Sequence, residues 1–164
     1  MKARLTTGLG DIELELDKAK APDTVANFIR YLEAGHYDGT IFHRVIKDFM
    51  IQCGGMDENM RNLSTDAPIK NEADNGLTNI LGSVAMARTS APHSASAQFF
   101  INTSDNHFLN HRDKTNEGWG YCVFGKVSDG MDVVRKIEQV STGSRGGHQD
   151  VPEEIILIQK AVLI

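Results

Sequence analysis

Apolar and polar residues alternate in short stretches of this chain, a pattern that predicts strands. Residues 11–16 read Asp-Ile-Glu-Leu-Glu-Leu and alternate strictly, as a strand with one buried and one solvated face does. Gly8 and Gly10 precede this stretch and residues 3–7 lie upstream, so we expect an opening hairpin. Strict alternation favours antiparallel pairing, in which one face of the sheet stays in contact with water.

The segment that follows predicts a helix beginning at Pro22. Its apolar residues recur at i, i+3, i+4 and i+7 and form one stripe, Val25, Phe28, Ile29 and Leu32. Proline suits the first helical position because its missing N–H would be unpaired there in any case. Asp23 favours the positive end of the helix dipole, and Gly35 is typical of a helix end. We interpret the stripe as a face that packs on the core.

A second helix is predicted by a similar stripe, Val133, Val134, Ile137 and Val140. It follows the turn Asp129–Gly130, and we expect it to end near Gly143. Gly143, Gly146 and Gly147 are interpreted as a flexible turn, because they lack the strand-then-helix context of a phosphate-binding loop.

Short apolar stretches separated by turn residues surround these helices and are typical of strands: residues 41–46, 50–53, 84–87, 99–102, 121–127 and 155–164. Several short strands with two helices favour a mainly β fold, a closed or nearly closed antiparallel barrel with helices packed against it. Strands alternating with helices throughout would instead favour a parallel α/β sheet. Residues 54–82 have little periodicity, so we expect a structured surface loop there.

Composition narrows the classes of function. The 164 residues fit one domain spanning residues 1–164, and a formal net charge of −5 argues against a nucleic-acid partner, which a basic face usually binds. No apolar run approaches the ~20 residues of a membrane helix, and the N-terminus has no secretory pattern. Cys53 and Cys122 are interpreted as free thiols in the core. We therefore expect a cytoplasmic protein without a membrane partner.

Familiar catalytic motifs are absent from the sequence: it has no GxGxxG, GxxxxGK[ST], CxxC or GxSxG pattern. His107 and His111 have the spacing of metal ligands on a helix, but they lie in a polar stretch without helical periodicity and are interpreted as surface histidines. His43 could act as a base, yet a histidine on a strand beside Phe42 is more often a hydrogen-bonded structural group. We therefore expect no metal and no cofactor.

The remaining candidates combine one arginine with glutamines and apolar residues. On a strand at residues 98–102, Gln98 and Phe100 would share one face, and Phe99 and Ile101 the other. Together with other residues they could form an apolar pocket with a few directional donors: Arg44, Phe49, Met50, Gln52, Phe108 and Leu109. The alternative is a set of core residues with one salt-bridged arginine, and composition and periodicity alone favour this alternative.

Three blocks of the sequence resemble the signatures of cyclophilins. Residues 42–55 read FHRVIKDFMIQCGG and resemble FHR-x-I-x-x-FM-x-Q-x-G. Residues 85–88 and 96–101 read AMAR and SAQFFI, similar to the SMA-then-SQFFI pattern. Residues 123–127 and 129–134 read VFGKV and DGMDVV, similar to VFGKV-x-x-GM-x-VV. Ordered matches over nearly the whole chain are far more specific than one short motif.

The resemblance implies an eight-stranded antiparallel barrel capped by two helices, with the site on its outer face. It implies a peptidyl-prolyl cis/trans isomerase that acts on proline-containing peptides and on unfolded or flexible protein clients and so assists folding. We expect the protein to be a monomer. Carried over by position, the catalytic arginine is Arg44, the proline pocket is Phe49, Met50, Phe100 and Leu109, the polar substrate contacts are Gln52 and Gln98, and the edge that binds the peptide backbone is Ala87 with Arg88.

Three positions depart from the common eukaryotic pattern of the family. Phe108 stands where many members have Trp, Tyr121 where many have His, and Arg88 where Asn often follows the MA pair. The first two are similar to bacterial cyclophilins. Because the indole N–H that cyclosporin-type inhibitors use is missing at Phe108, we expect weakened cyclosporin affinity.

Two alternatives use the same residues differently. The chain could be a proline-peptide binding module or folding helper whose isomerase activity is incidental, because an exposed pocket and a backbone-pairing edge also serve binding. A weaker alternative is regulation by a metal bound to His107, His111 and Cys122.

Overall fold

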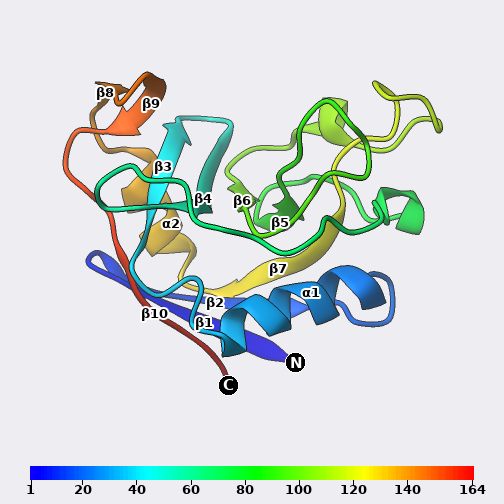
Figure 1. Cartoon of the computed structure of the whole chain (residues 1–164), viewed down its shortest axis with the longest axis horizontal. Helices are drawn as coiled ribbons and strands as arrows, with labels where there is room; N and C mark the ends of the chain where they lie inside the picture. Colours follow the sequence, from blue (N-terminus) through cyan, green and yellow to red (C-terminus); the bar gives the residue numbers. More distant parts are fainter.

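Eight strands form one antiparallel sheet that curls into a nearly closed barrel in the computed structural model, which describes residues 1–164 (Figure 1). The strands are β1 (Lys2–Thr7), β2 (Gly10–Leu16), β3 (Thr40–Ile46), β4 (Met50–Asp57), β5 (Ser83–Met86), β6 (Phe99–Asn102), β7 (Val123–Asp129) and β10 (Ile158–Leu163). Their order is β10-β1-β2-β7-β5-β6-β4-β3. The barrel closes where Ile41 bridges Leu157 and the Phe42 N–H donates to the Ile156 carbonyl at 3.0 Å. The predicted antiparallel barrel is confirmed.

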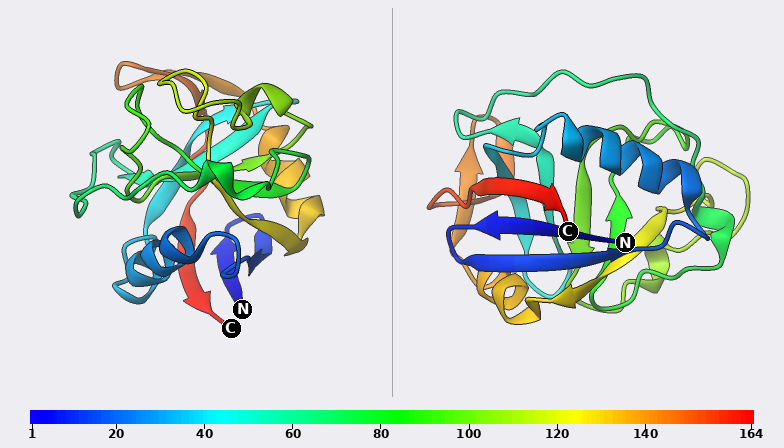
Figure 2. Two further views of the ribbon diagram at one scale, coloured as in Figure 1. Left: turned by 90° about the vertical axis from the view of Figure 1, so that its right-hand side faces the viewer. Right: turned by 90° about the horizontal axis from the view of Figure 1, so that it is seen from below.

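Helix α1 (Pro22–Glu33) lies where the sequence predicts it, with proline in its first turn. Phe28 is fully buried and meets three aromatic rings, those of Tyr37, Phe99 and Phe124, each at a centroid distance of 5.3 Å. Phe99 comes from β6 and Phe124 from β7, so this cluster joins the helix to the barrel interior. Figure 2 shows α1 and the second helix on different sides of the barrel.

Helix α2 (Met131–Glu138) begins after Gly130, whose φ of 93° lies in the left-handed region. A Cβ at Gly130 would collide with the carbonyl oxygen of Asp11, so glycine is required for the close approach to β2. Val133, Val134 and Ile137 are buried as predicted.

The helix ends earlier than the sequence predicts, at Glu138, and Gly143 lies within a strand. Strands β8 (Thr142–Arg145) and β9 (His148–Pro152) form a separate two-stranded sheet, and only Gly146 and Gly147 make the turn. The sequence gives no sign of this hairpin because β8 is exposed throughout and carries no alternation.

The loop predicted for residues 54–82 also begins later, because β4 continues to Asp57, which pairs with Thr40. Beyond β4, the short 3-10 helix η1 (Ala73–Asn75) is the one helical turn before β5. Cys53 and Cys122 are both buried free thiols, as predicted. Neither helix is long and apolar enough to cross a membrane.

We expect Phe28→Ala to lower the free energy of unfolding by about 3–5 kcal/mol, because it removes a fully buried ring and leaves a cavity among three others. Urea denaturation measures this loss. Leu9→Ala is the control, since Leu9 is 38% exposed and should change stability by no more than about 0.5 kcal/mol. A loss below about 1 kcal/mol for Phe28→Ala would contradict the assigned packing.

Candidate functional site

A row of side chains crosses four neighbouring strands on the outer face of the barrel. Arg44 of β3 pairs with Gln52 of β4, Gln52 with Phe100 of β6, and Phe100 with Ala85 of β5. Residues paired across neighbouring strands point to the same face of a sheet. The register therefore gathers an arginine, an amide and an aromatic ring that are up to 56 positions apart in the sequence (100 minus 44).

Residues of β6 alternate between two apolar clusters, as the sequence predicts. Phe99 and Ile101 belong to the large interior core. Phe100 belongs to a second, smaller cluster, which we call the outer cluster and which consists of Met50, Ala85, Phe100, Leu109 and Val123. Half-buried apolar residues pack against the outer cluster: Ile46, Phe49, Leu77, Ala87 and Tyr121. The proline-pocket residues implied by the family resemblance are thus brought together in one place.

Arg44 is exposed and has no carboxylate partner, so the interpretation of a salt-bridged core arginine is wrong. Its Nη1 donates to Oε1 of Gln52 at 3.4 Å, and Nε2 of Gln52 donates to Oε1 of Gln98 at 2.9 Å. Its Cζ lies 6.0 Å from the centroid of the Phe49 ring. The two glutamines therefore form a polar relay along the outer face that ends at the guanidinium, whose other N–H groups remain available to a ligand.

Aromatic rings form the rim of the outer cluster. Phe49 and Phe108 stack at a centroid distance of 5.7 Å, and Phe108 is 71% exposed. Phe100 and Tyr121 meet edge to face at 5.8 Å. An exposed ring stacked beside a buried apolar floor is typical of a ligand-binding surface.

Arg88 is turned toward the loop before β7. Its Nε donates to the Gly120 carbonyl at 2.9 Å, and its Cζ lies 4.8 Å from the centroid of the Tyr121 ring. The Ala87 N–H donates to the Gln98 carbonyl at 3.0 Å and is therefore occupied within the barrel. Any contact of the Ala87 backbone with a peptide would have to use its carbonyl.

Three buried asparagines, which no sequence motif above includes, connect the segments that carry the rim. Asn106 Nδ2 donates to the Phe49 carbonyl and to Oδ1 of Asn102, both at 2.8 Å. Asn102 Nδ2 donates to Oδ1 of Asn79 at 3.0 Å, and Asn79 Nδ2 donates to the Leu109 carbonyl at 3.3 Å. The one local signal is Asn102, which ends an otherwise apolar strand, where a polar residue is buried only with partners.

His43 is buried beside Arg44, and its Nδ1 has no hydrogen-bond partner. The prediction of a hydrogen-bonded structural histidine is therefore wrong for this atom. Burial lowers the pKa of His43 to about 4, helped by the nearby His148 and Arg44, so the ring is neutral at pH 7.

The three residues of the metal hypothesis are not gathered into a ligand group. No cluster of three or more His, Cys, Asp or Glu side chains could hold a metal ion. His107 is exposed as predicted, whereas His111 is half-buried and its Nδ1 lies 2.9 Å from the Trp119 carbonyl oxygen. Cys122 is buried next to Thr24, with 3.5 Å between Sγ and Oγ1. Burial raises the pKa of the Cys122 thiol to about 11, which disfavours the thiolate that a metal binds.

Comparisons with known proteins identify the family of the chain. A family model described as "Cyclophilin type peptidyl-prolyl cis-trans isomerase/CLD" matches residues 2–163. The chain is 61% identical over 160 residues to "Peptidyl-prolyl cis-trans isomerase cyp18" of Streptomyces antibioticus, covering 98% of this chain and 96% of the relative. It is 56% identical over 157 residues to "Peptidyl-prolyl cis-trans isomerase B" of Escherichia coli, covering 96% of each.

A solved structure has the same fold. The cyclophilin type peptidyl-prolyl cis-trans isomerase of Cryptosporidium parvum, crystallised in the presence of the dipeptide Ala-Pro, superposes with a TM-score of 0.79 at 29% identity. The match covers 100% of this chain and 99% of that one. The similarity therefore extends over the whole chain.

We expect His43 to destabilise the fold as the pH falls from 6.5 to 4. Its folded-state pKa of about 4 lies below the ordinary 6.5, so in this range the unfolded chain binds a proton that the folded protein does not. This group therefore lowers the free energy of unfolding by up to about 1.4 kcal/mol per pH unit as the pH decreases.

Urea denaturation between pH 7 and pH 4.5 measures this effect. His43→Gln should show a flatter pH dependence, whereas His107→Gln, at an exposed position, should keep the wild-type slope. An unchanged slope in His43→Gln would contradict the low pKa.

Proposed function

Because the chain belongs to the cyclophilin-type peptidyl-prolyl cis-trans isomerase family and is an isomerase of X-Pro peptide bonds, we propose that it works through the outer-face site with Arg44 as its catalytic residue. The observation that supports this role is a guanidinium without a carboxylate partner, aligned in one row with Gln52 and Phe100 beside an apolar pocket. A charged donor and an apolar floor are what this rotation needs.

The reaction makes and breaks no covalent bond. Its barrier is roughly 18–20 kcal/mol, because amide resonance is lost as the bond twists. In the twisted state the prolyl nitrogen recovers its lone pair and becomes a better hydrogen-bond acceptor. Arg44 stays charged and can donate to it, and a bond that is stronger in the transition state than in the ground state raises the rate.

One hydrogen bond from Arg44 does not account for the whole rate enhancement. Moving the exchange from minutes to milliseconds means about 10⁵-fold, or roughly 7 kcal/mol, whereas a hydrogen bond to a charged group contributes about 1.5–3 kcal/mol. The remainder would come from holding the proline ring while the preceding residue turns and from fixed dipoles at the twisted carbonyl. We propose that the proline ring of the substrate binds between Phe49, Met50, Phe100 and Leu109, and that Phe108 and Tyr121 form the rim of this pocket.

Gln52 and Gln98 are proposed to orient the guanidinium and to bind the peptide. Gln52 accepts from Arg44 and donates to Gln98, so both side chains have a fixed direction along the outer face. Ala87 and Arg88 are proposed as the edge that meets the peptide backbone, with the Ala87 carbonyl as the acceptor. The Arg88 guanidinium connects this edge to the loop before β7 through its contacts with the Gly120 carbonyl and the Tyr121 ring.

The substrates we propose are proline-containing peptides and unfolded or flexible protein segments, so that the enzyme assists folding. An outer-face site supports this, because a long chain can lie across it with both ends in solvent. The Cryptosporidium relative was crystallised in the presence of Ala-Pro. We also propose one domain over residues 1–164 that acts as a monomer in the cytoplasm, where buried free thiols such as Cys53 and Cys122 stay reduced.

Arg44→Ala should retain the fold, since Arg44 is exposed, and should lower kcat by about 10²- to 10³-fold, the range for losing a preorganised transition-state donor. Arg44→Lys should recover little, because an ammonium lacks the planar fork. Exchange NMR or a protease-coupled assay on an X-Pro peptide measures the rates. Arg4→Ala is the control, a half-exposed surface arginine on β1. A rate near that of the wild type in Arg44→Ala would remove Arg44 from the mechanism.

Phe108→Trp should tighten cyclosporin binding by about three- to tenfold, the value of one added neutral hydrogen bond from an indole N–H. Isothermal titration calorimetry compares the wild type with this variant. Phe108→Leu is the matched control, since it changes the same exposed position without supplying a donor. Equal affinities for the wild type and Phe108→Trp would show that the rim position does not limit inhibitor binding.

A further inference from the structure

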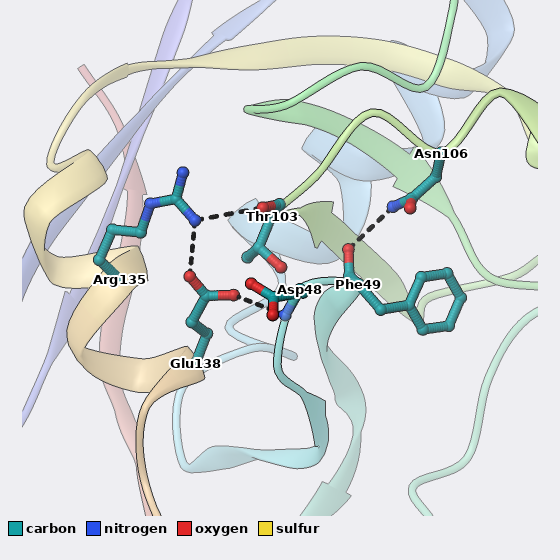
Figure 3. A network of polar contacts seen from close by, with 6 residues as sticks. All are labelled: Asp48, Phe49, Thr103, Asn106, Arg135 and Glu138. Carbon is teal, nitrogen blue, oxygen red and sulfur yellow. Dashed lines mark hydrogen bonds and ion pairs between the residues drawn. The ribbon is translucent and has the colours of Figure 1, made fainter.

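The turn between β3 and β4 carries Phe49 to the rim of the pocket in an unfavourable conformation. Asp48, the residue before it, has a φ of 60°, in the left-handed region that non-glycine residues rarely occupy. Contacts from the surroundings offset the cost of this conformation. The turn has its own hydrogen bond, from the Phe49 N–H to the Ile46 carbonyl at 3.1 Å, and Figure 3 shows further contacts that reach it from α2 and from the segment after β6.

Glu138 holds the turn at Asp48. This last residue of α2 directs its carboxylate at the turn, and Oε2 accepts from the Asp48 N–H at 3.1 Å (Figure 3). Its side chain is 1% exposed, and Oε1 accepts from Nη1 of Arg135 at 2.6 Å. Burial raises the pKa of Glu138, but the hydrogen bonds from Arg135 and from Asp48 outweigh it and leave the pKa below its ordinary value. Glu138 is therefore an ionised, paired carboxylate with a fixed direction.

The next residue, Phe49, is held from the other side. Its carbonyl accepts from the Thr103 N–H at 2.9 Å and from Asn106 Nδ2 at 2.8 Å. Arg135 connects these contacts with those of Glu138, since its Nη1 also donates to the Thr103 carbonyl at 3.2 Å. Successive residues of the turn are thus fixed by one connected set of charged and neutral hydrogen bonds, which leaves the Phe49 ring stacked on Phe108 and beside Arg44.

We propose that Glu138 is a positioning residue for the isomerisation: it holds the 46–49 turn so that the Phe49 ring stands ready to receive the proline. This inference rests on the proposed role of Phe49 in the pocket. Without the carboxylate, the turn leaves its left-handed conformation for part of the time, and the apparent affinity for substrate falls by the fraction of molecules that remain competent. Such a change raises KM and leaves kcat nearly unaltered, because the bound complex has the native geometry.

If Glu138 served only the stability of the fold, its loss would change KM and kcat in the opposite way. Loss of global stability reduces the amount of folded enzyme, which lowers the apparent kcat while KM stays the same. The split between KM and kcat therefore distinguishes positioning from stability. It also distinguishes Glu138 from Arg44, whose proposed action is on kcat.

The test compares full steady-state kinetics of two variants on an X-Pro peptide. Glu138→Ala should raise KM by about tenfold with kcat within about twofold of the wild type. Glu138→Gln keeps the volume and an acceptor for the Asp48 N–H but loses the charge, so it should raise KM in the same direction by a smaller factor. Amide hydrogen exchange measured by NMR should be faster at Asp48 in both variants. If Glu138→Ala does not fold, the kinetics and the hydrogen exchange are measured on Glu138→Gln alone.

Glu72→Ala is the matched control. The Glu72 carboxylate also accepts from a backbone amide, that of Thr24 at 2.7 Å, and from the Thr24 hydroxyl at 2.7 Å, but it holds the first turn of α1 and not the pocket. Its loss should lower stability and leave KM unchanged.

A third variant, Phe49→Ala, distinguishes the positioning role of Glu138 from the proposed role of Phe49 in the pocket. An unchanged KM in both Glu138 variants, with a raised KM in Phe49→Ala, overturns the positioning role alone. An unchanged KM in Phe49→Ala as well overturns the proposed pocket and, with it, this inference.

Discussion

The period of two along β4 and β6 is the constraint on which both the core and the site depend. Phe99 and Ile101 face the interior, while Phe100 faces the outer cluster. Gln52 and Cys53 divide in the same way on β4, with Cys53 in the interior. A slip of one residue in β4 would turn Gln52 into the core, and a slip of one residue in β6 would turn Phe99 out of it. The fold is therefore stable only in the register that also assembles the site.

The catalysed rotation changes no charge, and the site is built accordingly. Its floor is apolar, and the donor that we propose, Arg44, is an arginine that no carboxylate neutralises, in a chain of net charge −5. Loops supply the rim, and loops need polar contacts to stay in place. Asn79, Asn102 and Asn106 provide them from buried positions, where fully paired amides give a rigid arrangement and unpaired ones would be costly.

Sequence patterns predicted those parts of the fold in which local period and burial agree. The stripe of α1 and the alternation of β2 are confirmed because each buries one face. The β8–β9 hairpin was missed, since β8 buries nothing. On β3, residues 40–43 are buried in succession and Arg44 alone is then exposed, so no period could indicate which way its side chain points. The family motifs implied Arg44 as the catalytic residue. Whether a carboxylate pairs with its guanidinium depends on residues that are distant in the sequence, and no local pattern reports them.

Helix α2 shows why the remaining features could not be predicted. Its eight residues bury Val133, Val134 and Ile137 in the core, and its last residue uses its side chain on a turn 90 positions earlier in the sequence. A helical stripe reports only the first of these two roles, and it led to a helix that was too long at its C-terminal end. The C-terminal end instead lies where Glu138 meets Asp48. One short helix therefore packs on the barrel through its apolar face and, through the buried carboxylate of Glu138, also contacts the turn that carries Phe49.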